Sequence, residues 1–264
     1  MSYSIKLVAD KTGLSVHTIR AWERRYSALK PSRTETNRRV YSEADVAKLN
    51  LLRQAIEKGH NISLIANLNE QDLLQLLGKQ PFSASIESPY EFLSKAETAI
   101  SHLDGKALES LLIRASAFLG IDQFISSVAV PLLNYIDQAW TQKKINIRHE
   151  HFATAIIRTH LDNLRRRIQV ENKSKKIIVT TPSNQLHELG ALLVAIVAAR
   201  QGWSVFYLGP HLPAKEIADS ALVVNADAIA LSVVYPENDN ATHDHLLSLY
   251  KIIPKTIKII VGGR

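Results

Sequence analysis

The sequence predicts a multidomain α and α/β protein, helical over about its first two thirds and alternating strands with helices over the rest. Its 264 residues exceed the usual size of a domain with one hydrophobic core, and a content of 46% apolar residues suffices to fill several cores. Apolar residues recur at helical spacing up to about residue 168. Beyond residue 174, short β-branched runs alternate with helical patterns, which is typical of a parallel sheet covered by helices.

The composition excludes several classes of protein. There is no cysteine, so disulfides, thiolate catalysis and cysteine-ligated metal sites are excluded. No apolar run approaches the roughly 18 residues of a membrane span, and the N-terminus lacks the apolar segment of a secretory signal. We therefore expect a cytoplasmic protein with no membrane partner.

Residues 1–78 predict a winged helix-turn-helix. Gly13 breaks a first helix, and Ser15 caps a second helix that has Ile19 and Trp22 on its apolar face. The opposite face of this second helix carries His17, Thr18, Arg20, Arg24 and Arg25. A basic second helix of this kind is typical of recognition helices that enter the major groove of DNA.

The polar, turn-rich residues 32–40 predict a short hairpin, or wing, in which Arg33, Arg38 and Arg39 face phosphates. Helices are expected over 42–57, 62–67 and 69–77. Residues 1–40 hold nine Lys and Arg against three Asp and Glu, and this positive excess favours a polyanion partner. A solvated basic surface is the alternative.

This N-terminal part resembles the MerR family of bacterial transcription regulators. The resemblance depends on residues 18–26 (TIRAWERRY), Pro31 with Arg33, residues 37–41 (NRRVY), and Asp45-Val46 with Leu49. It implies binding to double-stranded operator DNA by a homo-oligomer, with Tyr41 among the DNA-binding residues.

A linker at residues 79–89 precedes helical patterns at about 90–102, 104–118, 121–141 and 149–168, which together predict an up-down four-helix bundle over 90–170. Trp140 ends the third of these helices, and Glu150 with His151 open the fourth. An indole is a flat apolar cap, and a Glu-His pair beside it can hydrogen-bond a nucleoside. The alternative is an interfacial tryptophan beside a solvent-facing pair.

Residues 174–264 predict a Rossmann-like parallel sheet. Strands are expected near 175–181, 205–208, 228–233 and 258–261, with helices near 188–201, 213–225 and 242–250 between them. Ligands of such sheets bind outside the carboxyl ends of the strands. His187, Ser232, Gly262 and Gly263 are all expected there.

These residues resemble a cobalamin-binding module that has a histidine motif, a serine motif and a Gly-Gly pair at fixed separations. Gly190 and Ser232 enclose 41 residues, and Val234 and Gly262 enclose 27. The resemblance implies that His187 is the lower axial ligand of cobalt and that Ser232, Gly190, Gly262 and Gly263 accommodate the nucleotide tail.

The combination of motifs resembles the CarH/LitR type of light-sensing cobalamin repressors. In that type, the residues matching Trp140, Glu150 and His151 embrace the adenosyl group of adenosylcobalamin. Gln185 replaces the acid that usually accepts a hydrogen bond from the ligand histidine, and we expect its amide oxygen to accept that bond. Thr141 replaces a cobalt-binding histidine, which leaves switching by light open.

We therefore expect a transcriptional repressor, not an enzyme, whose dimeric or tetrameric assembly and operator binding are controlled by adenosylcobalamin. Two alternatives remain: a repressor of the same fold that acts without cobalamin through protein partners, and a corrinoid component of an enzyme. The sequence stops one residue after Gly263, so either the chain is truncated or the sheet is completed in another way.

Overall fold

The computed structural model describes residues 2–34, 37–79, 88–168, 174–234 and 240–263. The chain forms two compact units, Met1–Ala153 and Thr154–Arg264. The boundary between them falls inside one helix, α10 (Ile147–Arg167). In the described part of the chain, no helix is both long and apolar enough to span a membrane.

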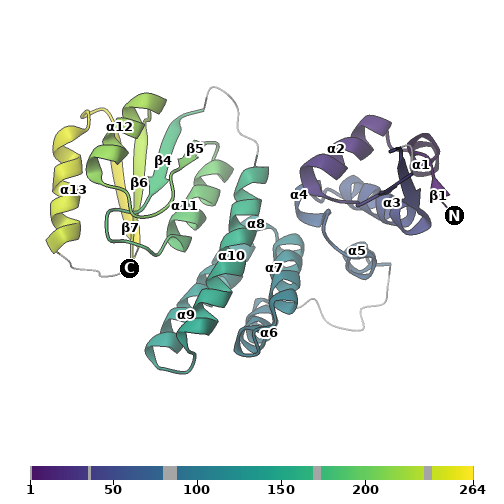
Figure 1. The fold of residues 1–264 in the computed structure, drawn as a ribbon, viewed down its shortest axis with the longest axis horizontal. Coiled ribbons are helices and arrows are strands. Elements are labelled where there is room, and N and C mark those ends of the chain that lie inside the picture. The colour runs from purple at the N-terminus through teal and green to yellow at the C-terminus, as the bar shows by residue number, and fades with distance from the viewer. Residues whose placement is uncertain (1, 35–36, 80–87, 169–173, 235–239, 264) are drawn as a thin grey trace. The chain divides into compact units, whose positions relative to one another are not determined.

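The first unit begins with a helix-turn-helix, as the sequence predicts (Figure 1). Gly13, at φ 68°, ends α1 (Ile5–Thr12) in the left-handed conformation that glycine adopts without strain. The Ser15 hydroxyl then accepts a hydrogen bond of 3.0 Å from the Thr18 N–H and so caps α2 (Val16–Tyr26). Ile19 and Trp22 turn inward from α2 into the core.

A three-stranded antiparallel sheet and further helices complete this N-terminal region. The strands are β1 (Ser2–Tyr3), β2 (Ser32–Arg33) and β3 (Arg39–Ser42), in the order β1-β3-β2, so the hairpin expected at 32–40 is present. Ser42 and Asp45 form a capping box at the start of α3, with hydrogen bonds of 3.1 and 2.8 Å. The helices that follow the sheet are α3 (Glu43–Glu57), α4 (Ile62–Ile65) and α5 (Glu70–Leu76).

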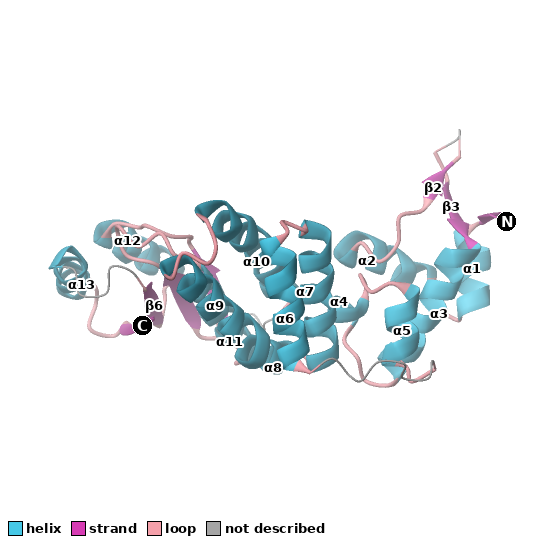
Figure 2. Cartoon of the chain, turned by 90° about the horizontal axis from the view of Figure 1, so that it is seen from below, coloured by secondary structure: helices cyan, strands magenta, loops and turns pink. Residues whose placement is uncertain are grey.

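The helical segments expected after the linker are also present. They are α6 (Pro89–Ser101), α7 (Gly105–Leu119), α8 (Ile121–Phe124), a π-helical segment (Ile125–Ala129) and α9 (Val130–Thr141), and α6 lies along α7 (Figure 2). Pro131 lacks the N–H that would bond to the Ser127 carbonyl, which explains the widened π turn before it. Most of α10 belongs to the second unit, so the predicted four-helix bundle stays a prediction.

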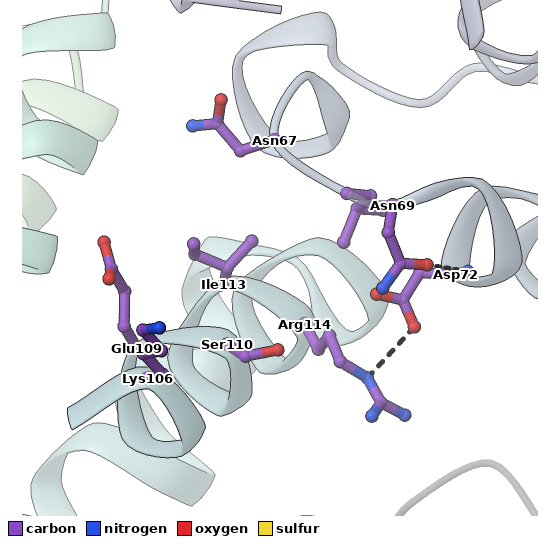
Figure 3. Close-up of a pocket in the computed structure, with 9 residues that line it drawn as sticks. Asn67, Asn69, Asp72, Lys106, Glu109, Ser110, Ile113 and Arg114 are labelled. Atoms are coloured by element: carbon purple, nitrogen blue, oxygen red, sulfur yellow. Dashed lines mark hydrogen bonds and ion pairs between the residues drawn. The ribbon is translucent and has the colours of Figure 1, made fainter. Parts of the chain in front are cut away.

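Helix α7 shares a core with the N-terminal region, which the sequence does not predict. The buried Ala117 lies in the core of the helix-turn-helix, and Ile113 packs against it. Arg114 of α7 forms an ion pair with Asp72 of α5, with Nε and Oδ1 3.3 Å apart, beside a hollow of about 200 Å³ (Figure 3). The predicted linker, of which residues 80–87 lie outside the described part, therefore does not separate two independent cores.

The second unit is a parallel four-stranded sheet covered by helices (Figure 1). Its elements are β4 (Lys176–Thr180), α11 (Leu189–Arg200), β5 (Ser204–Tyr207), α12 (Ala214–Val224), β6 (Ala228–Val233), α13 (Asn240–Ile252) and β7 (Lys258–Gly263). The strand order is β5-β4-β6-β7, so β5 is added on one side of β4, and β6 and β7 are added on the other. The topological switch point therefore lies between β4 and β6.

Alternating side chains of the central strands fill two separate cores. Ile178 and Ile229 pack with α12 and α13 on one face, whereas Val179 and Ala230 pack with α11 on the other. Both faces of β4 and β6 are therefore buried, as expected from their continuous apolar runs. This anchoring fixes the carboxyl ends of β4 and β6 side by side.

His160 of α10 should make the stability of the fold depend on pH. Burial, together with the charge of Arg167, lowers the pKa of its imidazole from 6.5 to about 3. As pH falls below 6.5, the unfolded chain takes up a proton that the folded chain does not, so stability decreases toward pH 3. Urea unfolding at pH 7 and pH 5 should show a smaller loss for His160→Gln than for the wild type. Equal losses would contradict this assignment.

Candidate functional site

The second helix of the helix-turn-helix presents the predicted basic face to solvent. The side chains of His17, Arg20, Arg24 and Arg25 are exposed. Thr18 is half-buried, and its hydroxyl lies 2.8 Å from that of Ser15 at the start of the helix. The exposed cations therefore lie on one continuous helix, available to a polyanion.

The hairpin adds two exposed arginines. Arg33 and Arg38 are open to solvent, and the Arg33 guanidinium donates a hydrogen bond of 2.6 Å to the Asn37 amide oxygen. Arg39 is partly withdrawn, because its Nε donates a hydrogen bond of 3.1 Å to the Glu23 carboxylate. Since this pair neutralises the one acidic residue of α2, the exposed charge on α2 is entirely positive.

Tyr41 does not lie on this face. Its side chain is fully buried in the core, where β3 pairs with β1 and Tyr41 lies opposite Tyr3. Burial, together with the charge of Glu23, raises the pKa of the Tyr41 hydroxyl to about 12. A side chain with no exposed surface has no atom to offer to DNA, so the predicted contact is corrected to a core role.

In the second unit, the loop that follows β4 is held in a defined conformation. The Thr181 hydroxyl accepts a hydrogen bond of 2.8 Å from the His211 N–H and donates one to the Gln185 carbonyl. The Asn184 N–H donates a bond of 2.7 Å to His211 Nδ1. Asn184 and His211 both have left-handed backbones, at φ 68° and 63°. The loop after β5 thus fixes the loop that carries His187.

Gln185 fixes this loop from the inside. Its side chain is almost fully buried, and its amide oxygen accepts a hydrogen bond of 3.0 Å from the Val234 N–H. Its amide nitrogen donates a bond of 3.4 Å to the hydroxyl of Thr242, on α13. The expected hydrogen bond from His187 to this oxygen is not observed, so Gln185 braces the loop and does not orient the histidine.

His187 itself points into solvent. Its imidazole is exposed, and no hydrogen bond to it occurs among the residues that the structure describes. Leu186 beside it is 69% exposed, which is unusual for a large apolar side chain. The imidazole is therefore available to an external ligand.

The predicted serine and glycines lie together at the same end of the sheet. Ser232, at the end of β6, is buried, and a Cβ added to Gly190 of α11 would lie 2.8 Å from its Oγ. Gly262 pairs with Ser232 across β6 and β7. Gly263 has φ 144°, and a Cβ there would lie 1.7 Å from the Val233 carbonyl oxygen. Both close approaches require glycine, as a narrow slot between helix and strands would.

Trp140, Glu150 and His151 belong to the first unit. Trp140 lies in the last turn of α9 and is 49% exposed. At the start of α10, Glu150 Oε2 lies 2.5 Å from Nδ1 of the exposed His151. The Thr141 hydroxyl is used within its own helix, where it donates to the Asp137 carbonyl at 2.9 Å.

Other contacts at these sites could not be predicted from sequence. Glu188 pairs with Arg158 and Tyr207, and His211 braces the loop before His187, yet each partner is remote along the chain. Within the described residues, no group of three His, Asp or Glu side chains could hold a metal ion by itself.

Comparison with known proteins finds a family match in each unit. Residues 3–72 match the family described as "MerR HTH family regulatory protein", and residues 175–264 match the "B12 binding domain". The chain is 28% identical to the "HTH-type transcriptional repressor CarH" of Myxococcus xanthus, covering 99% of this chain and 89% of that protein. It is 27% identical to the "HTH-type transcriptional repressor CarA" of the same organism, covering 100% and 87%.

A solved structure supports the fold. The monomethylamine corrinoid protein of Methanosarcina barkeri superposes with a TM-score of 0.52 at 13% identity, over 67% of this chain and 85% of that one. The two family matches, over residues 3–72 and 175–264, include the basic helix α2 and His187 respectively. The chain is therefore a MerR-type DNA-binding regulator with a B12-binding domain.

Proposed function

We propose that this regulator is a repressor whose oligomerisation and binding to operator DNA are controlled by adenosylcobalamin. The observation that carries the proposal is the uncommitted His187 imidazole at the switch point of the sheet, beside the close approach of Gly190 to Ser232. The CarH and CarA relatives are named as repressors, and this supports the sign of the regulation.

The second unit would hold the lower face of the corrin. His187 would donate an imidazole nitrogen to cobalt, and the Ser232 hydroxyl would hydrogen-bond the nucleotide tail. Gly190, Gly262 and Gly263 would let the backbone approach that tail closely. When bound, the cofactor would supply a cobalt centre that accepts this imidazole as a ligand. Gln185 contributes by holding the loop in place.

Residues of the first unit would serve the adenosyl group. The exposed Trp140 indole offers a flat apolar surface for an adenine ring. The Glu150 carboxylate can accept hydrogen bonds from ribose hydroxyls, with His151 beside it as a second polar partner. These three assignments rest on the chemistry of the side chains and on their resemblance to the cobalamin repressors.

The N-terminal region would bind the operator as a winged helix-turn-helix. His17, Thr18 and Arg20, near the start of α2, would contact base edges in the major groove, and Arg24 and Arg25 would contact phosphates. The arginines of the hairpin wing, Arg33, Arg38 and Arg39, would contact the flanking backbone. A dimer or tetramer would present two or more such helices, and the cofactor would favour DNA binding by preferring that assembly.

The direct test is titration of the purified chain with adenosylcobalamin in the dark. We expect a spectrum of cobalamin with histidine in place of its own base, an increase in molar mass, and tighter binding to a duplex selected from random double-stranded DNA. A second measurement after green light shows whether the assembly responds to light despite Thr141. An unchanged mass and unchanged DNA affinity would overturn cofactor control.

A repressor that acts without cobalamin is the second candidate. It is favoured by Gln185, which departs from the usual acid, and by Thr141, whose hydroxyl is occupied within α9. It predicts that the purified chain retains no corrin and still binds the selected duplex. A corrinoid enzyme component would instead bind corrin with no affinity for DNA.

A further inference from the structure

A cluster of polar side chains joins the His187 loop to helix α10, all within the second unit. The carboxylate of Glu188, the residue after His187, accepts a hydrogen bond of 2.5 Å from Arg158 Nε through one oxygen. Its other oxygen accepts a hydrogen bond from the Tyr207 hydroxyl at the end of β5. The Glu188 side chain is only 16% exposed, so both of its oxygens are directed inward.

The partners of Glu188 are themselves held in place. Arg158 and Arg165 lie seven residues apart on α10 and therefore on one face. The Arg165 guanidinium lies 5.5 Å from the centre of the Tyr207 ring, and Asp162 binds Arg165 at 2.7 Å. Tyr207 is thus fixed at its hydroxyl by Glu188 and over its ring by Arg165.

This cluster determines where His187 can lie. The loop is anchored on one side through Gln185 and, beyond His187, through Glu188. Only Leu186 and His187 lie between these two anchors, and both are exposed. Two fixed neighbours leave an imidazole few backbone conformations, which reduces the entropy lost when it binds a ligand.

We propose that Glu188 and Arg158 are positioning residues that preorganise His187 for cobalt ligation, an inference that rests on the proposed cobalamin function. The Arg158 side chain is 51% exposed, so its ion pair adds little to global stability. Its effect is on the conformation of the loop. Freeing Glu188 would reduce the fraction of molecules with His187 in the ligating position, and apparent affinity falls in proportion to that fraction.

The test compares Arg158→Ala, Arg158→Lys and Glu188→Gln in the full chain, with Lys215→Ala as control. Lys215 forms an exposed ion pair of 2.7 Å with Asp219 on α12, so its loss matches the broken contact without touching the loop. Adenosylcobalamin is titrated in the dark, and the histidine-ligated fraction is read from the absorption spectrum. The nitrogen splitting in the electron paramagnetic resonance spectrum of bound cob(II)alamin, recorded on protein labelled with nitrogen-15 in histidine, distinguishes the protein imidazole from the cofactor's own base.

We expect Arg158→Ala to weaken histidine ligation about tenfold, as for a ligating fraction reduced to about one tenth. Arg158→Lys should restore part of the loss, and Lys215→Ala should match the wild type. If Arg158→Ala lowers the melting temperature, its loss of ligation reflects unfolding as well as the loop. Glu188→Gln keeps an acceptor for Tyr207, and its ligation then tests the positioning role. If Arg158→Ala and Glu188→Gln both show wild-type histidine ligation, the positioning role is wrong, but the cobalamin proposal is unaffected. A wild-type chain that binds no cobalamin would overturn the cobalamin proposal as well.

Discussion

Replacing His187 with alanine should abolish histidine ligation of cobalamin and weaken corrin binding by on the order of 100-fold, at the upper end of the losses seen when residues that support metal ligands are removed. The imidazole is exposed and makes no hydrogen bond to the described residues, so its removal should leave the fold unchanged. Absorption spectra in the dark and equilibrium dialysis measure the two effects separately.

The matched control is His243→Ala. His243 is also exposed, and it lies on α13 in the same unit. This variant should retain the wild-type spectrum and affinity. A histidine-ligated spectrum in His187→Ala would show that another residue supplies the nitrogen.

The triple substitution of Arg20, Arg24 and Arg25 by alanine should weaken binding to operator DNA by on the order of 100-fold, since each good contact to DNA contributes roughly 1 kcal/mol or more. The slope of log affinity against log salt should fall by about one for each lost phosphate contact. Among the single variants, Arg20→Ala should relax the preference for the operator sequence. Arg24→Ala should instead lower the affinity for all duplexes equally. Fluorescence anisotropy at several salt concentrations measures both quantities.

Three exposed lysines of the second unit, Lys215, Lys251 and Lys255, provide the control. Their replacement by alanine lowers the net charge by the same amount but leaves α2 intact. If both triple variants lose affinity equally, bulk charge and not the helix would explain DNA binding.

Local patterns predict most of the fold. The apolar run at residues 228–233 predicts β6 at its observed bounds, and Gly13 with Ser15 predicts the turn between α1 and α2. Such features are visible because caps, turns and buried strands depend on neighbouring residues. The separations of Gly190, Ser232 and Gly262 likewise predict residues that meet at one end of the sheet.

The incorrect predictions concern contacts between distant segments. The resemblance to the MerR family implies that Tyr41 contacts DNA, but the pairing of β3 with β1 buries it. Gln185 lies two residues from His187, yet its amide bonds to Val234 and Thr242, about 50 residues away. No local pattern reveals that choice, since the amide oxygen accepts from the residue after β6 and the amide nitrogen donates to α13.

Gln185 holds the loop without carrying an ionisable group, whereas a carboxylate at this position would hold the loop and also ionise. An aspartate that binds the ligand histidine titrates in mild acid, so its influence on the metal changes together with its ionisation. A primary amide has no proton to gain or lose over that range. In this protein the hydrogen bonds that Gln185 makes to Val234 and Thr242 should therefore persist in mild acid.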